Sequence, residues 1–479
     1  MQSQTGGSVA QPTPPTVIPP APQPPKKRRM GLRIALIVVL VILLAGGGVA
    51  GWWVYTHRAD PIPDGTPARP AAAAVTSVIK PVPPTAPAPT ASGVEAQLAE
   101  PVRDKALGEF TGQVSDPLTG QTLWSSGAAD PRTPASNAKI LTAAAVLLTL
   151  PLDKTITTHV VLGDDGQAIL VGAGDPTLAT AADGTETFYT DPARISDLAE
   201  QIGKSGVHVT SVAYATPGFE GPSMDRTWDK RDIEGGDIAP LSSLMADAGR
   251  RDPLDEYSPR TDDPAAEAGR ALADALGVHS KVEQVDVPTG AETIASVTSA
   301  PLSVRVGDMM RFSDNVLAQM LSVELAEATG HEPSISGGVD AVLDALRKAG
   351  FDISDVTLRD ASGLSYGDKV PAAVLDRVMS ATVAGDNSAK LRSLLDTLPV
   401  AAGTGTLADR FDPDENAGAG WVRAKTGTLT GVTSLTGIVQ TVDGRVLSFA
   451  LMSGGTSPED ARPAIDQVAG ALRECGCRG

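Results

Sequence analysis

Residues 134–150, PASNAKILTAAAVLLTL, combine a serine, a lysine and a long apolar run. Ser136 precedes Lys139 by three residues, so in a helix that begins near Ser136 the two side chains lie on one face, about one turn apart. The residues that follow are apolar on every side, which predicts a helix buried inside a domain. A hydroxyl and an amine held together on a buried helix are the arrangement of the Ser–Lys pair in acyl-serine enzymes.

The spacing of Ser136 and Lys139 is weak evidence by itself. Ser77 and Lys80 have the same spacing, but they lie in a Pro/Ala-rich stretch where no helix is expected. Ser136 could also serve only as a helix N-cap, a common position for serine. The motif alone therefore leaves capping and nucleophilic chemistry open.

The composition narrows the class of protein. The chain has 479 residues, enough for two or three domains, and a net charge of −18. Such an acidic chain is a poor partner for nucleic acid, whose phosphates need a basic surface. The five histidines form no ligand pattern, and Cys475 and Cys477 lack the partners for a zinc site, so we expect no metal and no cofactor. For these two cysteines the sequence favours a frayed tail, with a strained or absent disulfide, over a redox site.

The first 92 residues of the chain indicate a membrane anchor. Residues 1–33 are Pro-rich and predicted to be disordered, and they contain a basic block at residues 26–29. Residues 34–55 are 22 residues without a charge, long enough to cross a bilayer as a helix. The preceding positive charges place the N-terminus in the cytoplasm and everything after residue 55 outside. The length of the apolar run favours an uncleaved anchor over a cleaved signal peptide, and residues 56–92 form a Pro/Ala-rich linker.

The folded part is predicted to begin near Gly93 as an α+β domain. Two strands at residues 111–115 and 122–125 flank a turn, and two more, at residues 435–440 and 446–452, pair near the C-terminus. Helices lie between these hairpins, including one over residues 302–328. We expect residues 93–180 and 285–479 to form one domain, an antiparallel sheet flanked by helices, with residues 181–284 inserted into it.

Two further motifs follow the Ser136 helix in the chain. Ser313-Asp314-Asn315 is the only Ser-x-Asn, and Lys425-Thr426-Gly427 is the only Lys-Thr-Gly. The second lies on a predicted strand, with glycine at a position where a substrate backbone would approach closely. The order Ser-x-x-Lys, Ser-x-Asn, Lys-Thr-Gly is that of penicillin-binding enzymes, and three chance matches in this order and local structure are improbable.

On these motifs the chain resembles the peptidase S13 family, the penicillin-binding protein 4 type of D-alanyl-D-alanine carboxypeptidase/endopeptidase. The resemblance covers most of residues 93–470 and includes the segments Gly174-Asp175-Pro176-Thr177-Leu178, Asp360-Ala361-Ser362-Gly363-Leu364-Ser365 and Lys425-Thr426-Gly427-Thr428-Leu429. It implies a β-lactamase/transpeptidase-like fold with an inserted domain. The chain departs from the family pattern at Gln319, Ala361 and residues 366–368.

The resemblance implies a role for each motif residue. It assigns Ser136 as nucleophile, Lys139 as base, Ser313 as proton relay and Asn315 as the residue that orients the substrate amide. Lys425 would bind the terminal carboxylate of the substrate. Residues that would contact the substrate around it are Thr426, Gly427, Thr428 and Asp175. The backbone N–H groups of Ser136 and Thr428 would form the oxyanion hole.

Lys139 can act as a base near pH 7 only if its pKa falls from about 10.4 to near 7. Burial and the neighbouring cation of Lys425 both act in that direction. The expected substrates are peptidoglycan stem peptides, and β-lactams would be covalent inhibitors. Three hypotheses stay open at this point: a membrane-anchored carboxypeptidase or endopeptidase, a β-lactamase or esterase on the same fold, and a non-catalytic cell-wall scaffold.

Overall fold

The computed structural model describes residues 85–476, which all belong to one compact unit. The predicted anchor, residues 34–55, and residues 56–84 of the predicted linker lie outside the described residues. Within residues 85–476, no helix has both the length and the apolar character needed to cross a membrane.

A five-stranded antiparallel sheet joins the two ends of the described chain. Its strand order is β10-β11-β12-β1-β2, so the N-terminal hairpin pairs with the C-terminal hairpin through β1 and β12. This confirms the predicted pairing of hairpins from both ends into one α+β domain. The strands are β1 (Thr111–Asp116), β2 (Gln121–Ser126), β10 (Val422–Leu429), β11 (Val432–Gln440) and β12 (Val446–Gly454).

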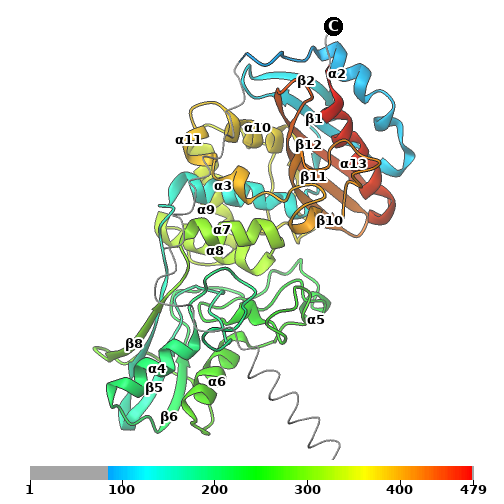
Figure 1. Ribbon diagram of the computed structural model, residues 1–479. Coiled ribbons are helices and arrows are strands. Elements are labelled where there is room, and N and C mark those ends of the chain that lie inside the picture. Colours follow the sequence, from blue (N-terminus) through cyan, green and yellow to red (C-terminus); the bar gives the residue numbers. More distant parts are fainter. Residues whose placement is uncertain (1–84, 477–479) are drawn as a thin grey trace, which may run out of the picture. The chain divides into compact units, whose positions relative to one another are not determined.

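Helices cover both faces of this sheet (Figure 1). Side chains alternate between the faces along a strand, and β12 shows this plainly. Its residues Leu447, Phe449 and Leu451 enter a core with helices α2 (Ala91–Leu98) and α13 (Pro458–Glu474). Ala450 and Met452 enter a second core with α3 (Ala138–Thr149) and α10 (Ala372–Val383). The sheet is therefore buried on both sides.

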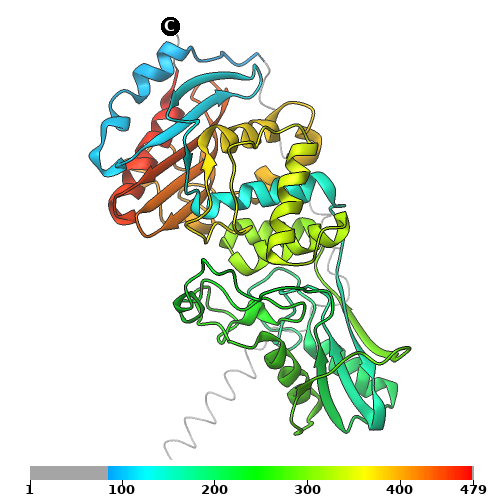
Figure 2. The same cartoon turned by 180° about the vertical axis from the view of Figure 1, so that it is seen from behind.

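The second core is mostly helical and contains the apolar helix that follows Ser136. Figure 2 shows this helical layer from behind. Helix α3 (Ala138–Thr149) runs through its centre, and ten of its residues are buried, as the apolar pattern predicts. The surrounding helices are α7 (Leu302–Phe312), α8 (Asn315–Thr329), α9 (Ile335–Lys348), α10 (Ala372–Val383), α11 (Ser388–Leu391) and α12 (Leu394–Thr397).

A second five-stranded sheet lies between the first two motifs in the chain. Its order is β7-β6-β5-β4-β8, with β5, β6 and β7 parallel and the β4 pairs antiparallel. Helices α4 (Ile195–Ser205) and α6 (Pro264–Leu276) pack on it around a third core. The strands are β4 (Thr157–Leu162), β5 (Gln167–Val171), β6 (Ser211–Ala215), β7 (Glu283–Gln284) and β8 (Glu292–Thr298). These strands begin before residue 181 and end after residue 284. The inserted domain at residues 181–284 stays a prediction.

The remaining elements are short. The segment at residues 215–262 contains one four-residue helix, α5 (Arg231–Glu234), and a turn of 3-10 helix at Asp247–Gly249. Strands β3 (Pro131–Arg132) and β9 (Val370–Pro371) form a two-residue ladder. Further 3-10 turns are Pro101–Arg103, Lys105–Leu107, Ala135–Asn137, Asp164–Gly166 and Gly405–Leu407.

Two expectations from the sequence are wrong. The predicted helix over residues 302–328 is two helices, because Ser313 has a left-handed backbone with a φ of 57° and Asp314 caps the second helix. The apolar pattern runs on through this break, so periodicity could not reveal it. Cys475 is buried, so the expected fraying of the tail does not include this residue, and it is disulfide-bonded.

The loop at residues 360–366 packs against the turn that carries Ser136. Asp360 organises this loop: its carboxylate accepts hydrogen bonds from the backbone N–H groups of Ser362, Gly363 and Ser365. Gly363 has a φ of 85°, and a Cβ atom there would lie 1.8 Å from the carbonyl oxygen of Ala135. Only glycine therefore lets the loop lie this close to the turn.

We predict that Gly363→Ala destabilises the fold by several-fold more than Gly350→Ala. Gly350 has a similar φ of 86° but nothing within 4 Å of the added Cβ, so its substitution reports only the left-handed backbone, about 1 kcal/mol. The additional cost at Gly363 comes from moving the Ala135 carbonyl. Denaturant unfolding of the two full-length variants measures the difference. Equal losses of unfolding free energy would show that the loop can move away at no cost.

Candidate active site

Ser136 lies in a single 3-10 turn, Ala135–Asn137, directly ahead of α3. Neither this turn nor α3 has a side-chain N-cap, so the capping explanation of Ser136 fails. Ala135 has a φ of 48°, and the bent backbone brings Ser136 next to Lys139 at the start of the helix. The Lys139 side chain is completely buried.

The amine of Lys139 has three oxygen neighbours from three parts of the chain. Its Nζ lies 2.9 Å from Ser136 Oγ, 2.6 Å from Asn315 Oδ1 and 2.8 Å from the backbone oxygen of Ser362. The first motif, the second motif and the loop at residues 360–366 therefore meet at one nitrogen atom.

Ser313 and Asn315 flank the break between α7 and α8. The side chain of Ser313 faces Lys425, whose Nζ donates to Ser313 Oγ at 2.8 Å and to the backbone oxygen of Thr426 at 2.8 Å. Asn315 donates from Nδ2 to the backbone oxygen of Asp237 at 3.0 Å. The five predicted catalytic residues thus form two hydrogen-bonded groups: Lys139 with Ser136 and Asn315, and Lys425 with Ser313. The two groups meet at one cavity, which Ser136, Ser313 and Asn315 line.

Burial changes the acidity of both lysines. Desolvation lowers the pKa of Lys139 to about 7, although the carboxylates of Asp360 and Asp314 act in the opposite direction. Desolvation and the charge of Lys139 also lower the pKa of Lys425 well below its usual range. Protonation of both buried amines at once costs free energy, because burial and the like charge each disfavour the charged form. Lys139 is therefore available as a base near neutral pH.

Strand β10 passes beside the Ser136 turn and carries the third motif. A Cβ atom at Gly427 would lie 2.2 Å from Ser434 Oγ and 2.7 Å from the Pro134 carbonyl oxygen. Glycine is thus required here by the protein's own backbone, which is a different reason from the substrate approach expected from the sequence. Thr426 Oγ1 lies 2.8 Å from Thr406 Oγ1, and Thr428 Oγ1 accepts a hydrogen bond from Arg462 at 3.3 Å.

A cavity of about 780 Å³ opens over this cluster. Ser136, Ser313 and Asn315 line it, as do Thr426 and Thr428, whereas the lining does not include the two lysines. The remaining lining residues are Asp237, Glu256, Tyr257, Arg311, Phe312, Gly363, Leu364, Gly405, Thr406, Asp409, Arg410, Leu429 and Arg462. A bound molecule would meet the reactive hydroxyls directly and the lysines only through them.

Two residues predicted to contact the substrate do not line this cavity: Gly427, whose neighbours on β10 do line it, and Asp175. Its carboxylate is buried and accepts hydrogen bonds from the backbone N–H and the hydroxyl of Thr177. The loop around it is joined to Leu244 by an isolated bridge. In this structure Asp175 shapes the loop at residues 172–178, and burial raises its pKa.

Sequence reasoning missed part of the site. The loop at residues 360–366 was recognised as a familiar segment, but nothing local indicated that the Ser362 carbonyl would reach Lys139. Arg462 lies on α13 in a helix pattern that gives no hint of a site, and Asp237 lies in a segment whose elements could not be placed. These residues join the cluster only through the tertiary fold.

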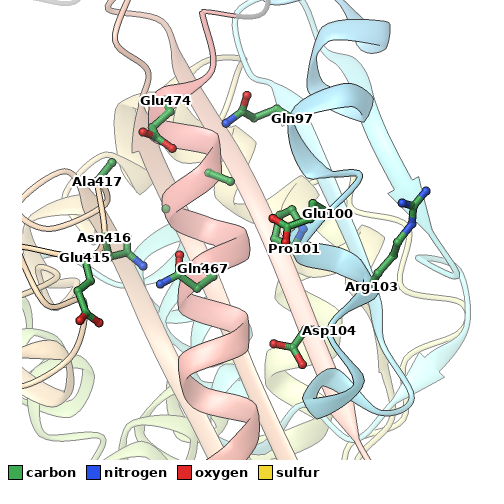
Figure 3. Close-up of a pocket in the computed structure, with 12 residues that line it drawn as sticks. Gln97, Glu100, Pro101, Arg103, Asp104, Glu415, Asn416, Ala417, Gln467 and Glu474 are labelled. Carbon is green, nitrogen blue, oxygen red and sulfur yellow. The ribbon is translucent and has the colours of Figure 1, made fainter.

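A second cavity, of about 680 Å³, lies between α13 and the segment at residues 97–104 (Figure 3). Four of its lining residues are acidic: Glu100, Asp104, Glu415 and Glu474. It shares no lining residue with the Ser136 cavity and contains none of the three motifs. The Ser136 cavity is therefore the candidate active site.

Comparisons with known proteins agree with this geometry. Residues 94–258 and 254–475 match the D-Ala-D-Ala carboxypeptidase 3 (S13) family. The chain is 45% identical over 436 residues to carboxypeptidase DacB of Mycolicibacterium smegmatis, covering 90% of this chain and 94% of that protein. It is 30% identical over 466 residues to a D-alanyl-D-alanine carboxypeptidase of Actinomadura sp., covering 80% and 84% of the two chains.

The fold is also that of a solved structure. Penicillin binding protein 4 of Haemophilus influenzae superposes with a TM-score of 0.65 at 20% identity, covering 80% of this chain and 98% of that chain. The family match covers nearly all of the described residues, and the sequence relatives are similar over most of their length. The resemblance inferred from the motifs is confirmed: this chain belongs to the D-Ala-D-Ala carboxypeptidase 3 (S13) family of serine peptidases.

Proposed function

We propose that the protein is a serine-type D-alanyl-D-alanine carboxypeptidase that acts on peptidoglycan stem peptides through an acyl-serine intermediate. Family membership supports the activity, and the grouping of two serines, two lysines and an asparagine around one cavity supports the mechanism. The observation that carries the proposal is the environment of the Lys139 amine.

The oxygen neighbours of the Lys139 amine determine that its lone pair points to the Ser136 hydroxyl. Asn315 Oδ1 and the Ser362 carbonyl can only accept hydrogen bonds, so both take an N–H of Lys139. A neutral amine has two N–H bonds and one lone pair, and the remaining direction points to Ser136 Oγ, 2.9 Å away. Because the pKa of Lys139 is lowered to about 7, the neutral amine is well populated at neutral pH and can accept the Ser136 proton.

The reaction then follows in two halves. Ser136 Oγ attacks the D-alanine carbonyl carbon while its proton moves to Lys139, and N–H groups of Ser136 and Thr428 hold the oxyanion. The C–N bond breaks, and the proton that Lys139 accepted passes through Ser313 to the leaving amine, so Lys139 is neutral again; Lys425 holds the Ser313 hydroxyl at 2.8 Å. Water attacks the ester while Lys139 accepts its proton, and Lys139 returns that proton to Ser136 Oγ as the C–O bond breaks, which releases the peptide acid and restores Ser136.

We assign the terminal carboxylate of the substrate to one end of the cavity. This end is defined by Thr426, Thr428 and Arg462, which all line the cavity. The planar guanidinium of an arginine can donate two parallel hydrogen bonds to a carboxylate. Lys425 lies behind Ser313 and would act on the carboxylate through its charge and through Ser313.

A β-lactam would enter the same route and remain as an ester on Ser136. The Haemophilus influenzae protein of the same fold has been solved in complex with a β-lactam, which supports this part of the proposal. A β-lactamase or esterase would differ by fast hydrolysis of the ester, and a cell-wall scaffold by making no ester.

We predict that full-length protein incubated with benzylpenicillin gains one drug mass and that Ser136→Ala gains none. The ester forms only at Ser136, and slow hydrolysis keeps it in place. Intact mass spectrometry measures the adduct, and drug consumption is followed in the same samples. Consumption of the drug without an adduct would indicate a β-lactamase, and neither adduct nor consumption would leave the scaffold.

We predict that the rate of acylation by benzylpenicillin rises with pH and levels off above about pH 7. Lys139 must be neutral to accept a proton, and its pKa is lowered to about 7, so the protonated and inactive form dominates below that pH. The rate should fall about tenfold per pH unit on the acid side. A rate independent of pH between 5 and 8, in protein shown by fluorescence to stay folded, would exclude Lys139 as the base.

We further propose that residues 34–55 anchor the enzyme in the cell membrane, with the N-terminus in the cytoplasm and the catalytic part outside. The uncharged run, the basic block before it and the aromatic residues Trp52 and Trp53 at its far end support this. The linker at residues 56–92 would then hold the active site away from the bilayer.

The anchor predicts that full-length protein sediments with membranes, resists high-salt washing and is released by detergent. A variant lacking residues 34–55 should stay in the supernatant. The intact mass of the extracted protein tests the signal-peptide alternative, because cleavage would remove the N-terminal segment. Full-length protein found in the soluble fraction would exclude the anchor.

A further inference from the structure

The middle residue of the second motif points away from the catalytic cluster. Ser313 and Asn315 face the two lysines, whereas Asp314 turns into the segment between the first two motifs. One oxygen of its carboxylate caps α8 by accepting from the Leu317 N–H at 2.8 Å. The other oxygen accepts from Arg250 at 2.7 Å and from the Tyr189 hydroxyl at 2.8 Å.

Arg250, Tyr189 and Asp314 close a triangle of hydrogen bonds, because Arg250 also donates to the Tyr189 hydroxyl at 2.8 Å. We call these three residues the Asp314 clamp. The ion pair between Arg250 and Asp314 is buried: 1% of the Arg250 side chain and none of the Asp314 side chain is exposed. The Arg250 guanidinium also lies 3.8 Å from the centre of the Phe188 ring, and Phe188 packs on Phe312, 4.5 Å between ring centres.

The clamp acts on a backbone that needs support. Ser313 has a left-handed conformation that costs a non-glycine residue free energy and persists only where its surroundings enforce it. Asp314 directly follows it and fixes the start of α8. Burial alone would raise the pKa of Asp314, but the charges of Arg250 and Arg260 outweigh burial and lower it, so the carboxylate stays ionised. An ionised carboxylate is the form that can hold the Leu317 N–H, Tyr189 and Arg250 together.

We propose that Arg250 and Tyr189 are positioning residues for catalysis: through Asp314 they hold the helix break at which Ser313 and Asn315 meet the two lysines. Neither residue lines the Ser136 cavity, so their effect is on proton transfer rather than on substrate binding. This inference rests on the proposed acyl-serine function and assigns part of it to the segment that precedes the second motif.

The chain offers a matched control for a purely structural role. Arg305 on α7 pairs with Glu324 on α8 at 2.6 Å, with side chains 2% and 5% exposed. This second buried ion pair joins the same two helices but has no contact with Ser313, Asp314 or Asn315 among the hydrogen bonds of the described residues. Arg305→Met therefore reports the loss of a buried ion pair without disturbance of the motif.

The test compares full-length Arg250→Met with Arg305→Met. We expect Arg250→Met to lower the rate constant of acylation by benzylpenicillin, per mole of folded protein, by about tenfold to a hundredfold, the penalty for small misplacements of reacting groups. The KM for a D-Ala-D-Ala peptide should change little. Arg305→Met should lower the midpoint of thermal unfolding to a similar extent and leave acylation near that of the unaltered protein.

A double-mutant cycle separates the clamp from general destabilisation. Asp314→Asn alone should slow acylation, and adding Arg250→Met should slow it little further, because both changes release the same clamp. Adding Arg305→Met to Asp314→Asn should have only its own small effect. Full additivity of Arg250→Met and Asp314→Asn in the acylation rate would overturn the inference.

Milder variants keep the test decisive if Arg250→Met does not fold. Arg250→Lys keeps the charge but loses the two-pronged contact, and Tyr189→Phe removes only one hydroxyl. Both should slow acylation several-fold. The inference would be overturned if both milder variants were acylated at the rate of the unaltered protein. It would also be overturned if the Arg250 and Arg305 variants lost acylation rate equally. Absence of any adduct in the unaltered protein would instead reject the proposed function.

Discussion

Two lysine side chains, Lys139 and Lys425, are buried next to each other, and the rest of the site depends on how the fold tolerates them. Each amine loses its hydration and must find oxygen partners inside the protein. Lys139 finds them in the first motif, the second motif and the loop at residues 360–366. Lys425 finds them in Ser313 and in the backbone of its own strand. Four segments distant in sequence must therefore be placed together before either lysine can be buried.

The residues that the structure brings together could be named from the sequence because they belong to local motifs on recognisable elements. Ser136 and Lys139 lie about one turn apart, and Lys425 lies on a strand that was expected from the sequence. The helix break at Ser313 was missed because the apolar residues of α7 and α8 keep one continuous pattern. Its one signal was Asp314, an acceptable N-cap three residues before Leu317. Contacts such as Arg250 with Asp314 join residues 64 positions apart and leave no local pattern at all.

The segment between the first two motifs is part of the catalytic structure as well as a separate folding layer. The Asp237 carbonyl orients the Asn315 amide, and the Trp228 indole N–H donates to Asp360 at 2.8 Å. Thr227 reaches Ser365 in the same loop at 2.8 Å. Contacts with the second motif and with the loop under Lys139 thus come from one stretch that is poor in regular secondary structure. A segment chosen for such contacts need not show the periodicity by which helices and strands are recognised.

The carboxylates around Lys139 show how its pKa can stay low in an acidic protein. Asp360, Asp314, Asp237 and Asp368 each favour the protonated amine, and desolvation outweighs their sum. Their influence is limited in different ways. Asp314 lies in an ion pair with Arg250, and Asp360 is held by several N–H donors. Burial and the charge of Asp360 raise the pKa of Asp368 to about 8, so this group is mostly neutral at pH 7. A neutral carboxyl exerts little attraction on a cation. The surrounding carboxylates therefore leave the pKa of the Lys139 amine low, and the neutral amine can accept a proton near pH 7.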